Sequence, residues 1–227
     1  MKLKKVTPIE NFPRNRWYDD ACGTALALEL VGERWSLLIV RELMFGGRRF
    51  GELKANLGGI SANILTQRLE GLEASGILTR RKLPPPASVQ VYELTPWGYE
   101  SERAIQELGR WAVRSHQHDV TLPLSPASMM MSFRTMYSRE LAAGIDAAIG
   151  FRMGTENFVA QLGDGIEIRR GDGAADAIFA SDPMTLASVV YGGRPIADAE
   201  AAGALRIEGD RALAERFVTL FVLPPKI

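Results

Sequence analysis

The sequence has very few of the side chains that form disulfides or hold metals. Cys22 is the single cysteine among 227 residues, and the only two histidines, His116 and His118, lie close together near the middle of the chain. One thiol cannot form an internal disulfide, and neither histidine stands at a metal-ligand spacing from Cys22. We therefore expect a protein of a reducing compartment, without a metal site and without a bound cofactor.

Long apolar runs are also missing. No stretch approaches the roughly 18 apolar residues that a membrane span requires, and residues 1–13 lack the apolar core of a signal peptide. The prediction is a cytoplasmic protein with no membrane partner. A hydrophobic fraction of 46% and a charged fraction of 24% are typical of globular proteins, and the length allows one large domain or two ordinary ones.

The formal net charge of zero hides an asymmetry between the two halves. Residues 1–118 carry 17 Lys and Arg against 13 Asp and Glu, and residues 119–227 carry 10 against 14. A basic half joined to an acidic half indicates that only the first meets a polyanion, although many inert domains carry such an excess. Two prolines interrupt the helical pattern within 119–126. We therefore predict a domain over 1–118, a linker over 119–126 and a second domain over 127–227.

Helices and one hairpin are predicted in the first half. Apolar residues recur at helical spacing, and glycines follow most of these segments. The predicted helices cover 22–31, 34–45, 49–57, 61–75 and 96–116. Strand-like segments at 77–83 and 89–95 flank a turn that contains Pro84, Pro85 and Pro86. This order is that of a winged helix-turn-helix, in which the two middle helices form the motif and the hairpin forms the wing.

The predicted helix 61–75, with Ser61 as its N-cap, has the pattern of a recognition helix. Its apolar side chains fall in one arc and its polar side chains on the opposite side. Asparagine and glutamine bind adenine bidentately, hydroxyls contact bases or phosphates, and a helix N-terminus attracts phosphate. The candidate DNA contacts of this helix are Ser61, Asn63, Thr66 and Gln67. Arg68 lies nearer the apolar arc, so it either contacts DNA or pairs with an acidic neighbour inside the domain.

Basic and polar residues beside this helix extend the candidate DNA surface. They are Arg80, Arg81, Lys82, Ser88 and Gln90 on the hairpin, and Arg48 and Arg49 at the start of the helix-turn-helix. A projecting wing reaches phosphates or the minor groove, and arginines that precede the motif can clamp the DNA backbone. Taken alone, each of these charged side chains is equally consistent with an ordinary solvated surface. Their coincidence with a recognition-helix pattern favours double-stranded DNA as the partner.

Four segments carry a more specific pattern. They are CGTALALELVGERWSLLIVREL (22–43), RRFGEL (48–53), ISANILTQRLEGLEASG (60–76) and YELTPWG (92–98). These segments closely resemble the HxlR family of winged-helix regulators, which are related in fold to the MarR proteins. The resemblance covers about residues 17–118. It implies a DNA-binding transcriptional regulator, in our prediction a repressor, that binds a palindromic operator as a homodimer.

The resemblance also implies a dimer interface built from residues 14–26 and 97–116. Within it, Leu108, Trp111 and Ala112 belong either to the interface or to the monomer core. The chain departs from the family pattern at two positions. Many relatives have Cys-Pro where this chain has Cys22 followed by glycine, and many have lysine where it has Asn63. The second departure would alter the operator or weaken phosphate binding.

Cys22 is a candidate redox sensor, since some family members detect oxidants or electrophiles through this cysteine. A helix N-terminus lowers the pKa of a thiol, whereas Asp19 and Asp20 just before it oppose thiolate formation. The alternative is that Cys22 serves only packing, and at this point we prefer that interpretation.

The second half shows no catalytic constellation. Residues 127–227 contain no histidine, no cysteine, no glycine-rich phosphate loop and no paired-carboxylate motif, so we expect no enzyme activity. The pattern of this half is α+β. Helices are predicted over 128–141, 182–191 and 210–221, and strands over 146–153, 156–162, 165–170, 177–180 and 205–208.

Three segments of this half are ASDPMTL (180–186), GGRPIADA (192–199) and GALRIEGDRA (203–212). They resemble the sterol carrier protein type of domain over about residues 126–222. The resemblance implies helices packed on a curved sheet around an apolar pocket, without naming a ligand. Methionine is adaptable and common at promiscuous apolar surfaces. The candidate pocket residues, which are ordinary core in the alternative interpretation, are Met129, Phe133, Met136, Phe151, Met153, Phe158, Phe179 and Met184.

The whole chain is therefore predicted to be α+β, with an N-terminal winged helix-turn-helix domain and a C-terminal sterol-carrier-like domain. The hypothesis is a dimeric repressor in which a small apolar or amphipathic effector changes the spacing of the recognition helices. Two alternatives stay open. One is a lipid or small-molecule carrier with a vestigial DNA-binding domain, and the other is a C-terminal domain that serves only oligomerisation.

Overall fold

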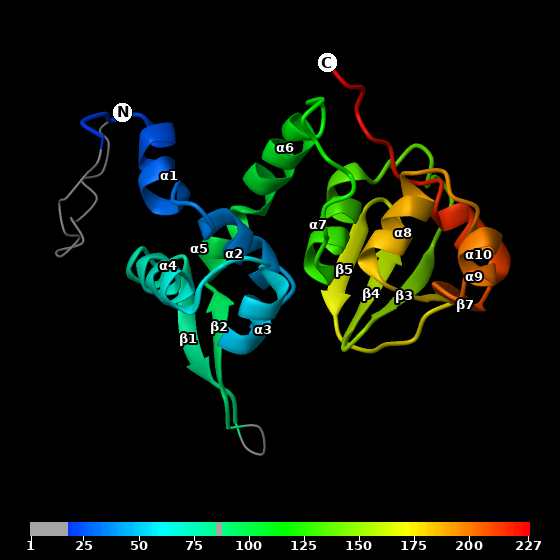
Figure 1. The fold of residues 1–227 in the computed structure, drawn as a ribbon, viewed down its shortest axis with the longest axis horizontal. Helices are drawn as coiled ribbons and strands as arrows, with labels where there is room; N and C mark the ends of the chain where they lie inside the picture. The colour runs from blue at the N-terminus through cyan, green and yellow to red at the C-terminus, as the bar shows by residue number, and fades with distance from the viewer. Residues whose placement is uncertain (1–17, 85–87) are drawn as a thin grey trace, which may run out of the picture.

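The computed structural model describes residues 18–84 and 88–227, so residues 14–17 of the predicted dimer segment and Pro85 and Pro86 of the predicted turn lie outside it. The first lobe contains α1 Gly23–Val31, α2 Ser36–Leu43, α3 Phe50–Asn56, α4 Ala62–Ala74, β1 Leu78–Lys82, β2 Gln90–Leu94, α5 Pro96–Glu100 and α6 Glu102–Ala112. In Figure 1 this lobe is coloured from blue to green, and α6 runs from it toward the second lobe.

Helices α3 and α4 and the β1–β2 hairpin form the predicted winged helix-turn-helix. α4 begins where the Ser61 hydroxyl accepts a hydrogen bond from the Ile64 N–H at 3.3 Å. β1 and β2 pair antiparallel along their full length. The backbone of Arg48 exchanges two 2.8 Å hydrogen bonds with that of Tyr92 on β2. This bridge fixes the wing against the start of α3.

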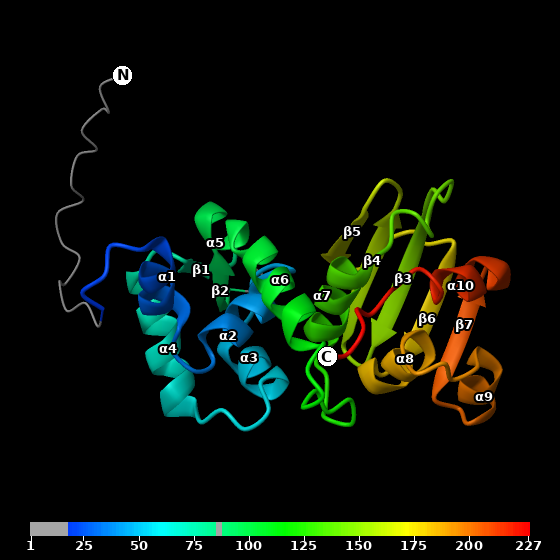
Figure 2. The same ribbon diagram turned by 90° about the horizontal axis from the view of Figure 1, so that it is seen from above.

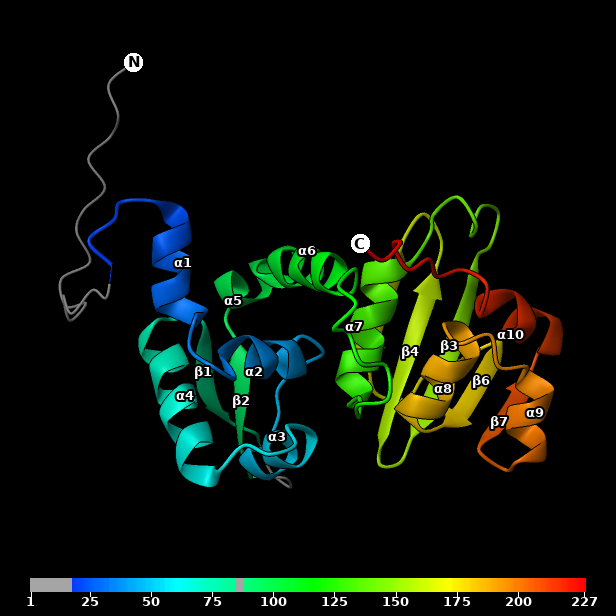
Figure 3. The ribbon, with the colours of Figure 1, turned by 45° about the horizontal axis from the view of Figure 1, so that its top comes forward.

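The prediction of one helix over 96–116 is wrong, because α5 ends at Glu100 and α6 ends at Ala112. Gly98 lies so close to the wing that a Cβ atom there would be 2.1 Å from the Ile77 carbonyl oxygen. The Ser101 hydroxyl donates a 2.7 Å hydrogen bond to the Gly98 carbonyl. α5 is thereby held against the base of the hairpin, and α6 starts as a new helix that leads to the second lobe (Figure 3).

The second lobe is a five-stranded sheet with helices on one face. It contains α7 Pro126–Met136, β3 Ala147–Met153, β4 Glu156–Leu162, β5 Ile166–Arg170, β6 Ala177–Ser181, α8 Pro183–Val190, α9 Ile196–Ala201, β7 Leu205–Gly209 and α10 Arg211–Phe217. The strand order is β5-β4-β3-β6-β7, with β3 and β6 parallel and the other neighbours antiparallel. Figure 2 shows the sheet beside the helices that cover it. No helix of the described residues has the length and apolarity to cross a membrane.

Phenylalanine rings fill the space between the helices and the sheet. Phe133 of α7 contacts Phe151 of β3 and Phe217 of α10, with ring centroids 5.5 and 5.3 Å apart. Phe179 of β6 stacks on Phe151 at 5.9 Å. All four side chains are fully buried. Aromatic contacts of this kind add to the free energy that burial of the rings already contributes.

Several element ends in this lobe differ from the sequence-based prediction. α7 begins at Pro126, inside the predicted linker, because the Ser125 hydroxyl accepts a 3.0 Å hydrogen bond from the Ser128 N–H. It ends at Met136 because Tyr137 turns to an extended conformation and bridges Phe221 near the chain end. α9 is absent from the prediction, since six residues are too few to display a helical period.

A buried carboxylate joins the two lobes. Glu156, the first residue of β4, accepts hydrogen bonds from Arg48 at 2.7 Å, Asn56 at 2.8 Å and Arg170 at 3.1 Å. The side chains of Arg48 and Glu156 are each only 8% exposed. Arg48 and Asn56 stand at the two ends of α3, and Arg170 ends β5. We refer to these four residues as the Glu156 cluster.

Apolar and polar contacts surround the Glu156 cluster. The rings of Phe45 and Phe158 meet edge to face at 5.7 Å, and the Arg134 guanidinium lies 4.4 Å from the Phe45 ring. The Glu42 carboxylate of α2 accepts a 2.5 Å hydrogen bond from the Ser125 hydroxyl. The lobes therefore share one continuous buried interface.

We expect Glu156→Gln to lower the free energy of unfolding by about 3 kcal/mol, because Arg48 and Arg170 lose their buried counter-charge. Urea unfolding at a fixed protein concentration measures this change. Glu208→Gln is the matched control, since Glu208 also lies on a strand beside two arginines, Arg152 and Arg206, but is 31% exposed. Its effect should stay within about 1 kcal/mol. An equal decrease in the free energy of unfolding of the two variants would contradict the stabilising role assigned to the buried Glu156.

Candidate nucleic-acid interface

The exposed face of α4 carries the residues predicted to contact DNA. Ser61, Asn63, Thr66 and Gln67 are all exposed, and the leucines of the opposite face are buried in the first lobe. The predicted division of this helix into a buried face and a solvent face is confirmed. The assignment of DNA contacts to the solvent face stays a prediction.

Arg68 does not contribute to that face. Its guanidinium pairs with Glu33, and its Nε donates a 3.1 Å hydrogen bond to the Arg34 carbonyl. The side chain therefore ties α4 to the loop between α1 and α2, which is the internal ion pair that the sequence allowed as an alternative. We remove Arg68 from the candidate DNA contacts.

The wing presents basic side chains that are exposed, and two of them are held in place by carboxylates. Arg80 pairs with Glu73 of α4 at 2.7 Å, and Arg81 pairs with Glu93 of β2 at 2.7 Å. The hydrogen bond from Arg80 lowers the pKa of the Glu73 carboxyl and raises that of the arginine. Lys82 makes no ion pair with any described residue. The Arg80–Glu73 pair fixes the wing relative to α4, the Arg81–Glu93 pair joins the two strands of the wing, and both arginines stay in contact with solvent.

The two polar residues that follow the wing turn are also accessible. Ser88 is exposed and has a backbone φ of 40°. Gln90 is exposed at the start of β2, within 3.5 Å of the Tyr92 hydroxyl. Both remain candidates for contacts with DNA.

The prediction that Arg48 clamps the DNA backbone is wrong. Its side chain is buried and donates to Glu156, a residue 108 positions away that no local pattern connects to it. Arg49, the next residue, is exposed, and its N–H donates a 2.8 Å hydrogen bond to Glu52 in the first turn of α3. Arg49 therefore stays among the candidate DNA contacts and Arg48 leaves them.

Lys54 is a further candidate that the sequence interpretation missed. It is exposed on α3, and its Nζ donates a 3.3 Å hydrogen bond to the Ile60 carbonyl, one residue before the Ser61 cap. A lysine ammonium therefore lies beside the N-terminus of α4, where the helix dipole also attracts anions. Its exposed position on the first helix of the motif was the signal that could have indicated it.

The predicted apolar pocket residues form the core of the second lobe. Seven of them are buried: Met129, Phe133, Met136, Phe151, Met153, Phe158 and Phe179. The eighth, Met184, is partly exposed near the start of α8. None of the eight lines either of the two cavities described below. The packing therefore supports the alternative interpretation, that these residues are ordinary core. The sequence could not separate the two interpretations, because a core and an apolar pocket contain the same large apolar residues.

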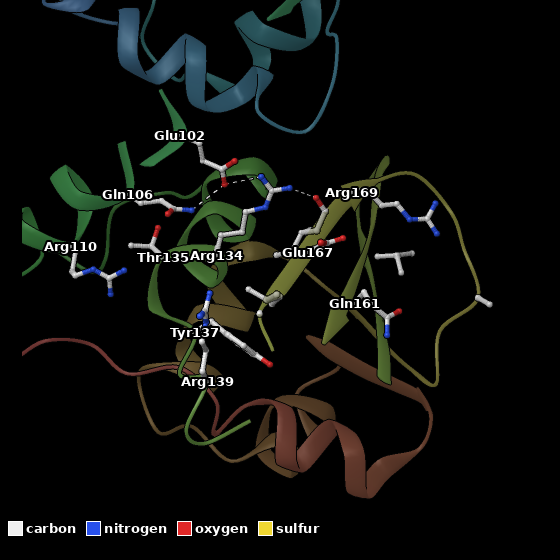
Figure 4. A pocket seen from close by; sticks show the side chains of 15 residues that line it. Glu102, Gln106, Arg110, Arg134, Thr135, Tyr137, Arg139, Gln161, Glu167 and Arg169 are labelled. Atoms are coloured by element: carbon white, nitrogen blue, oxygen red, sulfur yellow. Dashed lines mark hydrogen bonds and ion pairs between the residues drawn. The ribbon is translucent and has the colours of Figure 1, made fainter. Parts of the chain in front are cut away.

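Two cavities open elsewhere on the described surface. The larger, of about 710 Å³, lies between α6 and the edge strand β5 (Figure 4). The other, of about 590 Å³, lies between α8, α9 and α10. No group of three or more metal-ligating side chains occurs within the described part of the chain.

Large apolar side chains are exposed on the helices that the resemblance places in a dimer interface. They are Leu26 and Leu28 of α1, Trp97 of α5, and Leu108 and Trp111 of α6, and the Trp111 side chain is the most exposed of these at 70%. Ala112 is exposed as well. Of the two interpretations of Leu108, Trp111 and Ala112, the monomer-core one is wrong. The dimer interface itself stays a prediction.

Cys22 is the exposed N-cap residue of α1, so the packing role preferred from the sequence is wrong. Hydrogen bonds from the backbone and the hydroxyl of Thr24 lower the pKa of the Cys22 thiol. Asp20 accepts a 2.8 Å hydrogen bond from the Cys22 N–H. The helix N-terminus thus has a stronger effect on the thiol than the preceding acidic residues.

We expect the pH profile of Cys22 alkylation by iodoacetamide to have a midpoint below that of an ordinary thiol, since hydrogen bonds to the thiolate favour ionisation. Thr24→Val should move the midpoint upward, because it removes the hydroxyl hydrogen bond. Thr79→Val, at an exposed position on β1, is the control. An identical midpoint in the Thr24→Val variant and the wild type would contradict this assignment.

Comparison with known proteins matches the first lobe. Residues 30–120 match the family model described as HxlR-like helix-turn-helix. The HTH-type transcriptional regulator YodB of Bacillus subtilis is 37% identical over 86 residues, which cover 38% of this chain and 77% of YodB. A solved structure of the reduced form of YodB gives 35% identity and a TM-score of 0.38, and it covers 41% of this chain and 92% of that chain.

An uncharacterized HTH-type transcriptional regulator of Mycobacterium tuberculosis, Rv3095, is 46% identical over 85 residues, or 37% of this chain. The match spans about half of that relative, 53% of its length. These relatives are named as transcriptional regulators, which are DNA-binding proteins and not enzymes. From the winged fold, the family match and the identity to YodB, it follows that the chain belongs to the HxlR-like helix-turn-helix family.

Proposed function

We propose that the protein is a dimeric transcriptional regulator that inserts α4 into the major groove of a palindromic operator. The observation that carries this proposal is the exposed polar face of α4 beside a basic wing, on a chain of the HxlR-like family. Asn63 and Gln67 are assigned to base edges, and Ser61 and Thr66 to bases or phosphates.

The remaining contacts are assigned to phosphates and to the minor groove. Arg49 and Lys54 of the helix-turn-helix face the backbone on one side of the recognition helix. The wing supplies the others, which are Arg80, Arg81, Lys82, Ser88 and Gln90. Cations on both sides of the helix orient it on the duplex, and they make the affinity depend on salt because phosphate contacts release counterions.

A homodimer follows from the exposed apolar side chains of α1 and α6. Burial of Leu108, Trp111 and Leu26 against a second copy removes apolar surface that water otherwise covers. A two-fold axis places two α4 helices in successive major grooves about 34 Å apart, so the operator is a palindrome. We assign the dimer a repressing role, because an operator that overlaps a promoter is closed to polymerase when occupied.

The second lobe is assigned to sensing, within a sterol-carrier-like fold. Glu156 of this lobe contacts both ends of α3, through Arg48 and Asn56. An effector that binds two arrangements of the lobes with different affinity therefore shifts the position of the helix-turn-helix. The rival function is a lipid or small-molecule carrier with a vestigial DNA-binding domain. It is disfavoured because packed phenylalanines fill the core in which the apolar pocket was predicted.

We expect Gln67→Ala to weaken binding to the preferred duplex, selected from a randomised pool, by about 10-fold or more, since a bidentate base contact contributes roughly 1–3 kcal/mol. Its affinity for random DNA should not change.

Lys82→Ala should weaken binding to both duplexes and reduce the slope of log affinity against log salt by about 0.9, because one phosphate contact is lost. Fluorescence anisotropy at several salt concentrations measures both.

Gln117→Ala is the matched control, at an exposed glutamine outside the helix-turn-helix. The proposal fails if the selection enriches no sequence. It also fails if Gln67→Ala binds the selected duplex as tightly as Gln117→Ala does.

A further inference from the structure

The cleft between α6 and β5 has the size of a small-molecule site. Its volume of about 710 Å³ lies in the range of roughly 300–1,000 Å³ found for ligand pockets. Figure 4 shows α6 contributing Glu102, Gln106 and Arg110 on one side, and Glu167 and Arg169 of β5 on the other. We propose that this cleft binds a small organic carboxylate, which acts as the effector of the proposed regulator and therefore rests on that function.

Positive charge dominates the lining. Four arginines, Arg110, Arg134, Arg139 and Arg169, face two glutamates, Glu102 and Glu167. Arg134 is committed, because it pairs with Glu102 at 2.9 Å and also donates to the Ile168 carbonyl. The Arg134–Glu102 pair is neutral, so the other three arginines face a single remaining carboxylate.

Those three guanidinium groups are available to a ligand. The side chains of Arg139 and Arg169 are exposed, and neither makes an ion pair with a described residue. Arg110 lies 3.8 Å from Glu107, at the long limit of an ion pair between two exposed groups. The planar fork of a guanidinium matches a carboxylate with two parallel hydrogen bonds. A carboxylate is therefore the ligand group that this lining recognises best.

Apolar side chains also line the cleft. Val159 of β4, Ile166 and Ile168 of β5, and the ring of Tyr137 lie among the arginines. Val159 and Ile168 are already buried, so the apolar surface that a ligand can cover is that of the partly exposed Ile166 and Tyr137. An inorganic anion would leave these two side chains against water, whereas a carboxylate on an aromatic or aliphatic body would cover them. The ligand class is thus an organic acid, for whose carboxylate Arg110, Arg139 and Arg169 are the candidate partners.

The two sides of α6 serve different contacts. Glu102, Gln106 and Arg110 are spaced by four residues and form one stripe. At 3.6 residues per turn, Leu108 and Trp111 lie roughly on the opposite side. A second copy docked on Leu108 and Trp111 therefore leaves the cleft open. A ligand that contacts the first stripe acts on the same helix that carries the proposed dimer face.

Calorimetric titration of the full chain without DNA tests the site. The probes are 2-naphthoate, decanoate and the neutral 2-naphthamide. At least one of the two acids should bind with one site per chain, and 2-naphthamide should bind at least 10-fold more weakly than 2-naphthoate. At least one of Arg139→Gln and Arg169→Gln should weaken binding of the acid by about 10-fold. Arg206→Gln, at an exposed arginine of the opposite edge strand β7, is the matched control and should not change it.

Binding of neither acid overturns the proposal, and so does equal affinity for the acid and the amide. Wild-type affinity in both Arg139→Gln and Arg169→Gln also overturns it, and because both residues are exposed these variants should keep the wild-type unfolding temperature. A bound acid should change operator affinity at least threefold, and an unchanged affinity excludes the effector role. If an acid binds through these arginines while no specific DNA binding exists, the site stands and the proposed function fails.

Discussion

The buried carboxylate of Glu156 determines how the two lobes are placed. A carboxylate taken out of water must recover its lost hydration from fixed donors, and Arg48, Asn56 and Arg170 supply them. The pairing is not complete, however. Burial, with the nearby charge of Arg48, lowers the pKa of Arg170. One nitrogen each of Arg48 and Arg170 has no hydrogen-bond partner among the described residues. A buried ion pair of this kind contributes little net stability relative to an apolar contact, but it strongly favours one arrangement over others.

That property suits the movement of the two lobes that the proposed function requires. A buried charge cluster either keeps its partners or exchanges them for water, since a buried charge without a partner is strongly destabilising. In the proposed regulator, the Glu156 cluster would therefore favour discrete arrangements of the lobes over continuous sliding, which is the requirement for a two-state switch. Because Arg48 and Asn56 bracket α3, any change in the cluster acts on the helix that packs directly before the recognition helix.

The cluster and the cleft meet on one strand. Arg169 lines the cleft and Arg170, the next residue of β5, donates to Glu156. The two arginines are adjacent on one strand and point to opposite faces. A displacement of β5 by the proposed ligand at Arg169 would therefore also move Arg170 within the cluster. The path from the cleft to α3 consists of one strand, one carboxylate and two donors. If the proposed ligand couples to α3, that coupling would pass through few rigid elements.

How much of this was accessible from the sequence depended on the range of the contacts involved. The buried face of α4, the hairpin and the strand positions follow from periodicity within a few residues, and they agree with the structure. The predicted role of Arg48 disagrees with the structure, since Glu156, the residue that pairs with the buried Arg48 side chain, lies 108 positions away. The division of the helix after Glu100 likewise depends on the approach of Gly98 to Ile77. In both of these failures a contact between distant segments decided the outcome, and no local pattern records such contacts.

Packing also explains why we propose the cleft, and not the apolar core, as the effector site. The core of the second lobe is closed by the contacts among Phe133, Phe151 and Phe217. Opening a ligand-sized cavity among them would cost several kcal/mol at about 24 cal/mol for each Å³ of cavity volume, and the ligand would have to supply that energy before it bound. The cleft beside α6 is already open, so most of the binding energy of a carboxylate remains for selecting one arrangement of the lobes. A sensor built at an interface couples its ligand to movement directly, whereas a sensor built in a packed core must first undo its own fold.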